Sequence, residues 1–230
     1  MRFKPYITFI LVSLFVFITN TPGYSATVRK KVAVKASRII TISGSEIQNG
    51  VILIEDGIIK AVGDNVEIPW DASVIEAKDR VVMPGFVLAH TSNGLERANE
   101  NVPEVPFLST FDSITPISPY FEDSLRDGVV AMLVLPGNYT LLGGTGTVVR
   151  PCGRTVEAML IKSYTGLKIS LRPTVGTNRM GHMQRFRRYI DDLKDYLEEY
   201  KQRKADAEEE KKPFDEEIDP RKQPMIDLLN

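Results

Sequence analysis

The sequence predicts an α/β protein, and three features of the chain indicate this class. Short apolar stretches separated by turn signals fill residues 31–82 and predict a small antiparallel β unit. Two apolar strands then flank a helical segment between residues 86 and 135, as in the βαβ unit of a parallel sheet. A long segment with helical periodicity begins near Gly181.

Composition and charge exclude several classes of protein. The 230 residues include 29 Lys and Arg against 30 Asp and Glu, so the formal net charge of -1 gives no general attraction to nucleic acid or to an anionic membrane. We therefore expect no nucleic-acid partner. The single cysteine, Cys152, excludes an internal disulfide, and two histidines, His90 and His182, are too few for a His-rich metal cage.

The first 25 residues have the pattern of a secretory signal peptide. Arg2 and Lys4 precede an apolar run over 7–18, and small residues at Gly23 and Ser25 suit cleavage before Ala26. The alternative, a transmembrane anchor, needs about 20 apolar residues, which this run does not reach. We expect a periplasmic or secreted protein without a stable membrane anchor, in which Cys152 is a small buried apolar residue rather than a catalyst.

Residues 26–82 are expected to form the first domain. Apolar stretches at 32–42, 51–54 and 58–62 predict strands, with turns at Asn49-Gly50 and Asp56-Gly57, because these residue pairs tolerate positive φ. Two further strands are predicted at 74–77 and 81–83, separated by a polar turn at 78–80.

Residues 83–230 are expected to form the second domain. The continuous apolar run 86–89 predicts a strand buried on both faces and ending at His90. A polar loop over 91–119 leads to a helix at 120–127, which Gly128 ends, and to a buried strand at 129–135. Shorter strands are expected at 147–150 and 167–171, with a short segment at 156–162 between them.

The last predicted element is an amphipathic helix over about 181–212. Its apolar residues recur at steps of three and four and share one stripe, made of Met183, Phe186, Ile190, Leu193, Leu197 and Tyr200. This pattern favours a helix that packs on its own domain over a dimerising coiled coil, which needs more sustained heptads. The sequence leaves open whether the chain forms a homo-oligomer.

Candidate site residues follow the first strand of the second domain. His90 stands at the carboxyl end of a predicted parallel strand, where barrel enzymes gather their active-site residues, although a lone histidine can also be structural. The following loop offers Glu96, Arg97, Asn99 and Glu100, which either line the mouth of such a site or form a solvated polar loop. His182, at the start of the long helix, is expected at the surface.

A glycine-rich segment offers a second candidate. The backbone N–H groups of Gly143, Gly144 and Gly146 could approach a substrate oxyanion or a phosphate. The segment lacks the lysine and the spacing of known phosphate-binding loops, so a plain turn is the favoured interpretation.

Several segments together resemble the amidohydrolase superfamily, especially its imidazolonepropionase-like branch. They are "EDGIIKAVGDNVEIPWDASVIEAKDRVVMPGFVLAHT", "SPYFEDSLRDGV" and "LPGNYTLLGGTGTVVRPCGRTVEAMLIK". The resemblance implies that 26–82 form a β-sandwich half and that 83–230 form the opening strands and helices of a (β/α)8 TIM-type barrel, which is incomplete. It also implies hydrolysis of carbon–nitrogen bonds other than peptide bonds in a small linear or cyclic amide, with a divalent metal such as zinc.

The sequence departs from the family at the metal-binding motif. The family's His-x-His reads His90-Thr91-Ser92 here, and Leu88 replaces the family's aspartate. His90 is therefore the one metal position carried across, while Ser92 marks a lost ligand and joins the residues expected at the barrel mouth. The resemblance places the other metal and proton-transfer residues beyond Asn230, so no catalytic residue is named.

Two hypotheses follow for the function. The chain is either the N-terminal portion of a hydrolase or a non-catalytic, truncated or degenerate member of the same family that binds a ligand or a partner.

Overall fold

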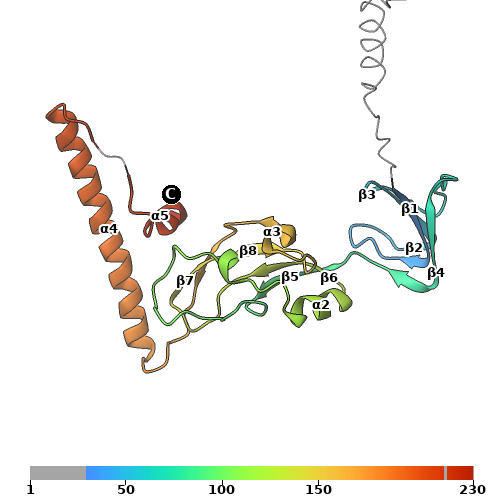
Figure 1. Cartoon of the computed structure of the whole chain (residues 1–230), viewed down its shortest axis with the longest axis horizontal. Coiled ribbons are helices and arrows are strands. Elements are labelled where there is room, and N and C mark those ends of the chain that lie inside the picture. The colour runs from blue at the N-terminus through green and yellow to red at the C-terminus, as the bar shows by residue number, and fades with distance from the viewer. Residues whose placement is uncertain (1–29, 215–216, 230) are drawn as a thin grey trace, which may run out of the picture. The chain divides into compact units, whose positions relative to one another are not determined.

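The computed structural model describes residues 30–214 and 217–229 (Figure 1). The predicted signal peptide and its cleavage site lie outside these residues. The described residues divide into two compact units, and the division falls between Pro84 and Gly85.

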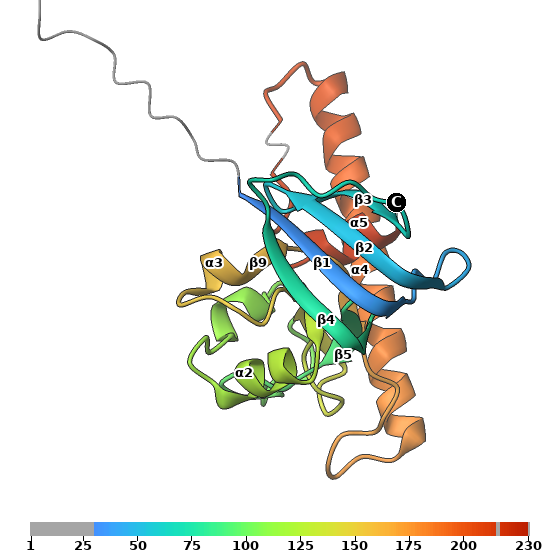
Figure 2. The ribbon, with the colours of Figure 1, turned by 90° about the vertical axis from the view of Figure 1, so that its right-hand side faces the viewer.

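The first unit is a four-stranded sheet with the order β3-β2-β1-β4 (Figure 2). Strands β1 (Lys31–Ile39), β2 (Ile47–Glu55) and β3 (Ile58–Gly63) pair antiparallel, and β4 (Ser73–Val82) lies parallel to β1. The predicted turn at Asp56-Gly57 is confirmed, since both residues have positive φ, 51° and 79°. Ala33, Val51 and Leu53 form the core on one side of the sheet.

Two predicted turns of this unit lie inside strands. Gly50 pairs with Ala36 within β2, and residues 78–80 form a bulge within β4 opposite Ser37. The Ser37 hydroxyl donates to the Arg80 carbonyl at 3.1 Å across this bulge. In both places pairing with β1 outweighs the local turn preference. The described residues of the first unit form one sheet, so they do not include the second layer of a β-sandwich.

The second unit begins with the predicted βαβ arrangement. Strand β5 (Phe86–Thr91) connects through a loop and helix α2 (Pro119–Arg126) to β6 (Val129–Val134), which pairs with it in parallel. Gly128 has a φ of 85° just after α2 and ends the helix as predicted. A short 3-10 helix, Thr110–Ser113, lies in the preceding loop.

The sheet of this unit continues with antiparallel strands. Its order is β5-β6-β8-β9, with β8 at Thr147–Val149 and β9 at Leu160–Lys162, joined by helix α3 (Val156–Met159). Strands β7 (Leu142–Thr145) and β10 (Leu167–Ile169) form a separate antiparallel pair. The part of the chain that the structure describes is thus mixed α/β and contains no closed barrel.

Strand β5 differs from its predicted burial on both faces. Phe86 and Val87 are 55% and 72% exposed, and within the described ranges β5 pairs with β6 alone and forms an edge of the sheet, where fewer neighbouring side chains cover a strand. The core lies deeper, around β6, β8 and the helices, and contains Ile114, Phe121, Met132, Val134, Val149 and Met159.

Helix α4 runs from Arg179 to Glu209, and α5 from Gln223 to Leu229. The Asn178 side chain caps α4 by accepting the Gly181 N–H at 3.0 Å. The predicted apolar stripe packs on its own unit: Phe186, Ile190, Leu193 and Leu197 surround Leu141, Leu142, Met225 and Ile226. None of the helices within the described ranges is long and apolar enough to cross a membrane.

Candidate functional site

The carboxyl end of β5 is tied to the elements around it. Thr91 is buried, and its hydroxyl lies 2.9 Å from the Tyr120 hydroxyl of α2 and accepts the Asn93 N–H at 3.0 Å. The Leu135 N–H donates to the Thr91 carbonyl at 2.9 Å. These bonds hold the backbone on which His90 stands, while the His90 side chain itself is exposed.

The His90 imidazole contacts a lysine from a distant strand. Its Nε2 atom lies 3.3 Å from Nζ of the half-buried Lys168 in β10. An ammonium group can only donate hydrogen bonds, so a hydrogen bond at this contact requires Nε2 as the acceptor and therefore the ring tautomer with its hydrogen on Nδ1. Among the described residues Lys168 forms no ion pair with an acidic side chain.

The residues at this strand end do not fit a catalytic divalent metal. Residues 30–214 and 217–229 contain no group of three or more His, Cys, Asp or Glu side chains that could hold one. A catalytic zinc site usually takes about three protein ligands, and here a single imidazole faces a cation while Ser92 supplies only a hydroxyl. These residues therefore do not supply the metal site that the first hypothesis, a metal-dependent hydrolase, would use.

The polar loop after β5 packs against residues 137–140. Asn99 accepts the Tyr139 N–H at 2.8 Å, and its amide lies so close to Gly137 that a Cβ there would stand 2.6 Å from Oδ1. The Glu100 N–H donates to the Thr140 hydroxyl at 3.2 Å. Asn99 and the Glu100 backbone thus fasten the loop to the segment that follows β6.

A small cavity of about 30 Å³ lies beneath this loop. It brings together Arg97, Asn99, Glu100 and Gly143, and its volume suits little more than one water molecule. His90, Ser92 and Glu96 do not line it. The residues predicted at a common barrel mouth therefore do not all line this one cavity.

The glycine-rich segment is a strand rather than the predicted turn. Gly143 and Gly144 lie in buried β7, where Gly144 has a φ of 83° and a Cβ would stand 2.6 Å from the Leu108 carbonyl oxygen. The N–H groups of Thr145 and Gly146 donate to the carbonyls of Leu108 and Gly166, both at 2.8 Å. These two N–H groups therefore already donate hydrogen bonds to carbonyl groups of the protein.

Two single-residue predictions are wrong. His182 is 0% exposed rather than at the surface, because the start of α4 docks beside the segment after β10 and places Nε2 2.9 Å from the Ser170 carbonyl oxygen. That oxygen only accepts, so Nε2 carries the hydrogen, and Nδ1 has no partner among the described groups. Cys152 is exposed rather than buried, since it lies in the loop between β8 and α3.

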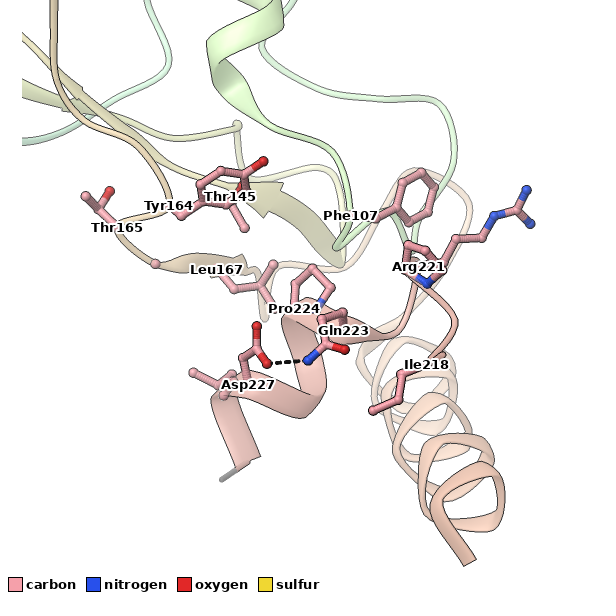
Figure 3. Close-up of a pocket in the computed structure, with 13 residues that line it drawn as sticks. Phe107, Thr145, Tyr164, Thr165, Leu167, Ile218, Arg221, Gln223, Pro224 and Asp227 are labelled. Carbon is pink, nitrogen blue, oxygen red and sulfur yellow. Dashed lines mark hydrogen bonds between the residues drawn. The ribbon is translucent and has the colours of Figure 1, made fainter. Parts of the chain in front are cut away.

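A larger, open cavity of about 760 Å³ lies between the loop before β10 and the C-terminal segment (Figure 3). Its lining is mainly apolar and includes Phe107, Tyr164, Leu167, Ile218, Pro224 and Leu228. Gln223 donates to Asp227 at 2.5 Å on the same side. Sequence reasoning missed this cavity because it forms only where residues about 60 positions apart meet, and no local pattern marks it.

Comparisons with known proteins point to one group. No family model matches the chain. An amidohydrolase of Hapsidospora irregularis is 28% identical over 130 residues, which are 51% of this chain and 12% of that protein. The 5-methylthioadenosine/S-adenosylhomocysteine deaminase of Caldicellulosiruptor saccharolyticus is 27% identical over 182 residues, 73% of this chain and 38% of that protein.

One solved structure is similar over most of the chain. The crystal structure of an amidohydrolase from Thermotoga maritima aligns with a TM-score of 0.72 and 26% identity over 84% of this chain and 54% of that one. The chain thus spans well under two thirds of the proteins it matches, which agrees with similarity to a portion of an amidohydrolase.

Proposed function

Because its homologues are amidohydrolases, we propose that this chain is the N-terminal portion of a hydrolase acting on carbon–nitrogen bonds other than peptide bonds in small molecules. The observation that carries this proposal is the alignment with the Thermotoga maritima amidohydrolase over 84% of the chain. Since the chain spans 54% of that protein, the activity belongs to the whole protein.

The deaminases among the relatives suggest a substrate class. One is a 5-methylthioadenosine/S-adenosylhomocysteine deaminase and another, from Methanosarcina barkeri, is a 5'-deoxyadenosine deaminase that is 40% identical over 62 residues, 26% of this chain and 14% of that protein. We propose adenosine derivatives as the first substrates to try. In such a reaction water supplies the oxygen that replaces the exocyclic amino group, and ammonia leaves.

The proposed compartment is the periplasm or the exterior of the cell. Its support is the signal-like sequence of residues 1–25, with charged residues before a short apolar run. Detection of a mature N-terminus at Ala26 on protein recovered from those compartments is the expected result, and a retained Met1 there would contradict it.

The test of the hydrolase proposal is ammonia release by the protein isolated from its source, together with its intact mass. The assay offers 5-methylthioadenosine, S-adenosylhomocysteine and 5'-deoxyadenosine, with and without added zinc. We expect ammonia above the enzyme-free blank for at least one of them. A protein that binds these nucleosides and releases no ammonia under either condition contradicts hydrolysis of this substrate class.

A second candidate function is binding without turnover. The contact between His90 and Lys168 favours it, because a lysine ammonium contacts the imidazole of the residue that the resemblance assigns to a metal. Calorimetry separates the candidates: heat of binding with no ammonia release supports this second function, and release of ammonia in proportion to protein refutes it.

A further inference from the structure

We propose that His90 and Lys168 form a metal-free cationic site that binds the carboxylate group of a small organic acid. The inference rests on the proposed function only in taking the carboxyl end of β5 as a ligand-binding position. It adds a ligand class and a residue, Lys168, that the sequence resemblance does not assign to the site.

The hydrogen-bonding capacity of Lys168 supports this assignment. Its ammonium has three N–H donors, and the contact of 3.3 Å with His90 Nε2 uses one of them. Among the described residues no carboxylate pairs with the other two, although the side chain is only half-buried and can be reached from solvent. A carboxylate accepts two such bonds, and charge-assisted bonds of this kind are the stronger ones in proteins.

The position of Lys168 is set by the pairing of β10 with β7. The residues on either side of it are paired, Leu167 with Thr145 and Ile169 with Leu142. Its stem lies beside Gly143, where a Cβ would stand 3.5 Å from Lys168 Cγ, an ordinary van der Waals distance.

This arrangement also explains the misfit with a divalent metal. The lone pair of His90 Nε2 is directed to an ammonium group, so a metal ion at that nitrogen would have to displace a positive charge. The positive charge that the resemblance places at His90 as a metal ion is thus supplied by the Lys168 ammonium. The site attracts an anion without any bound ion.

The test uses nitrogen-15 spectra of the histidine rings in the full chain. Because the chain has two histidines, His90→Gln and His182→Gln assign both rings. We expect opposite tautomers: the hydrogen on Nδ1 in His90, and on Nε2 in His182, which donates to Ser170. A His90 ring with its hydrogen on Nε2 overturns the proposal.

Acetate is the probe for the ligand. We expect its addition at constant ionic strength to shift the His90 ring signals with saturation, and Lys168→Met to weaken that binding by about tenfold or more, as loss of a charge-assisted bond predicts. Lys168→Arg should retain most of it. Lys162→Met, at an exposed lysine of β9, is the matched control and should leave the affinity within about twofold.

Two further results would overturn the site. One is equal acetate affinity in Lys168→Met and in the unaltered chain. The other is a stoichiometric zinc-induced shift of the His90 signals in the unaltered chain, which would show that the ammonium does not exclude a metal. None of these readouts needs turnover, so a failure of ammonia release and a failure of this proposal are separate results.

Discussion

His182 is buried within the second unit, and its ring forms a hydrogen bond at one of its two nitrogens. The Nε2 hydrogen bond to Ser170 links the first turns of α4 to the segment after β10. Its removal leaves a cavity and an unpaired carbonyl oxygen.

We predict that His182→Ala lowers the free energy of unfolding by about 2–4 kcal/mol, from the lost packing and hydrogen bond together. His90→Ala, at an exposed ring, should change it by less than about 0.5 kcal/mol. Urea unfolding followed by circular dichroism measures both. Equal effects of the two substitutions would contradict the buried position of His182.

Tyr189 makes the stability of the fold depend on pH. Burial raises its pKa above the ordinary value of 10.0, and the nearby negative charges of Glu104 and Asp219 raise it further. A raised pKa means that the folded state holds the phenolic proton more tightly than the unfolded state. Its contribution to stability is therefore complete below pH 10 and is lost as the pH rises through the folded pKa.

We predict that unfolding becomes easier above pH 10 and that Tyr189→Phe reduces this alkaline loss. Tyr164→Phe is the control, since Tyr164 is 70% exposed and should leave the profile unchanged. Urea midpoints measured across the alkaline range, with tyrosinate absorbance recorded in parallel, provide the measurement. An identical profile in Tyr189→Phe and the unaltered chain would refute the assignment.

At the scale of the element, α4 is attached to its unit through one stripe. Leu193 is 1% exposed and lies in the cluster that also contains Leu141, Leu142, Met225 and Ile226. The outer face of the helix is charged and solvated, as at Glu198. The stability of a single amphipathic helix in water is marginal, so α4 depends on this contact.

We predict that Leu193→Ala destabilises the unit by about 2–5 kcal/mol and that Glu198→Ala has an effect near zero. Hydrogen exchange of the α4 amides should accelerate in the first variant and stay unchanged in the second. Protection of α4 that survives Leu193→Ala would mean that the helix is held in another way.

The elements differ in how far the sequence predicts them. The hairpin turn at Asp56-Gly57, the end of α2 at Gly128 and the stripe of α4 were all predictable, because turn chemistry and periodicity act over a few residues. The strand at Gly143-Gly144 was not, because pairing of β7 with β10 imposes it on residues that locally favour a turn.

At the scale of the whole molecule, apolar side chains remain exposed in each unit. Ile58, Ile59, Val74 and Ile75 are exposed in the first unit, and Phe86 and Val87 in the second. Val87 lies on the edge strand β5, whose outer backbone groups have no strand partner among the described residues. Exposed apolar edge strands favour association with other chains.

We predict that the chain self-associates at micromolar concentrations and that Val87→Lys reduces the association, because a charged edge residue opposes strand pairing. Val175→Lys is the control, since Val175 is 92% exposed but lies in a loop. Sedimentation velocity at several concentrations measures the effect. An unaltered chain that stays monomeric throughout would contradict this prediction.

The sequence by itself determined the order and type of most elements and the relationship to amidohydrolases, because periodicity, turn residues and motifs are local properties of the chain. The tertiary structure decided which side chains meet. His90 and Lys168 are 78 positions apart, and no local pattern couples them. The burial of His182 depends in the same way on where α4 docks, since burial is a property of the packed surroundings and not of the residue.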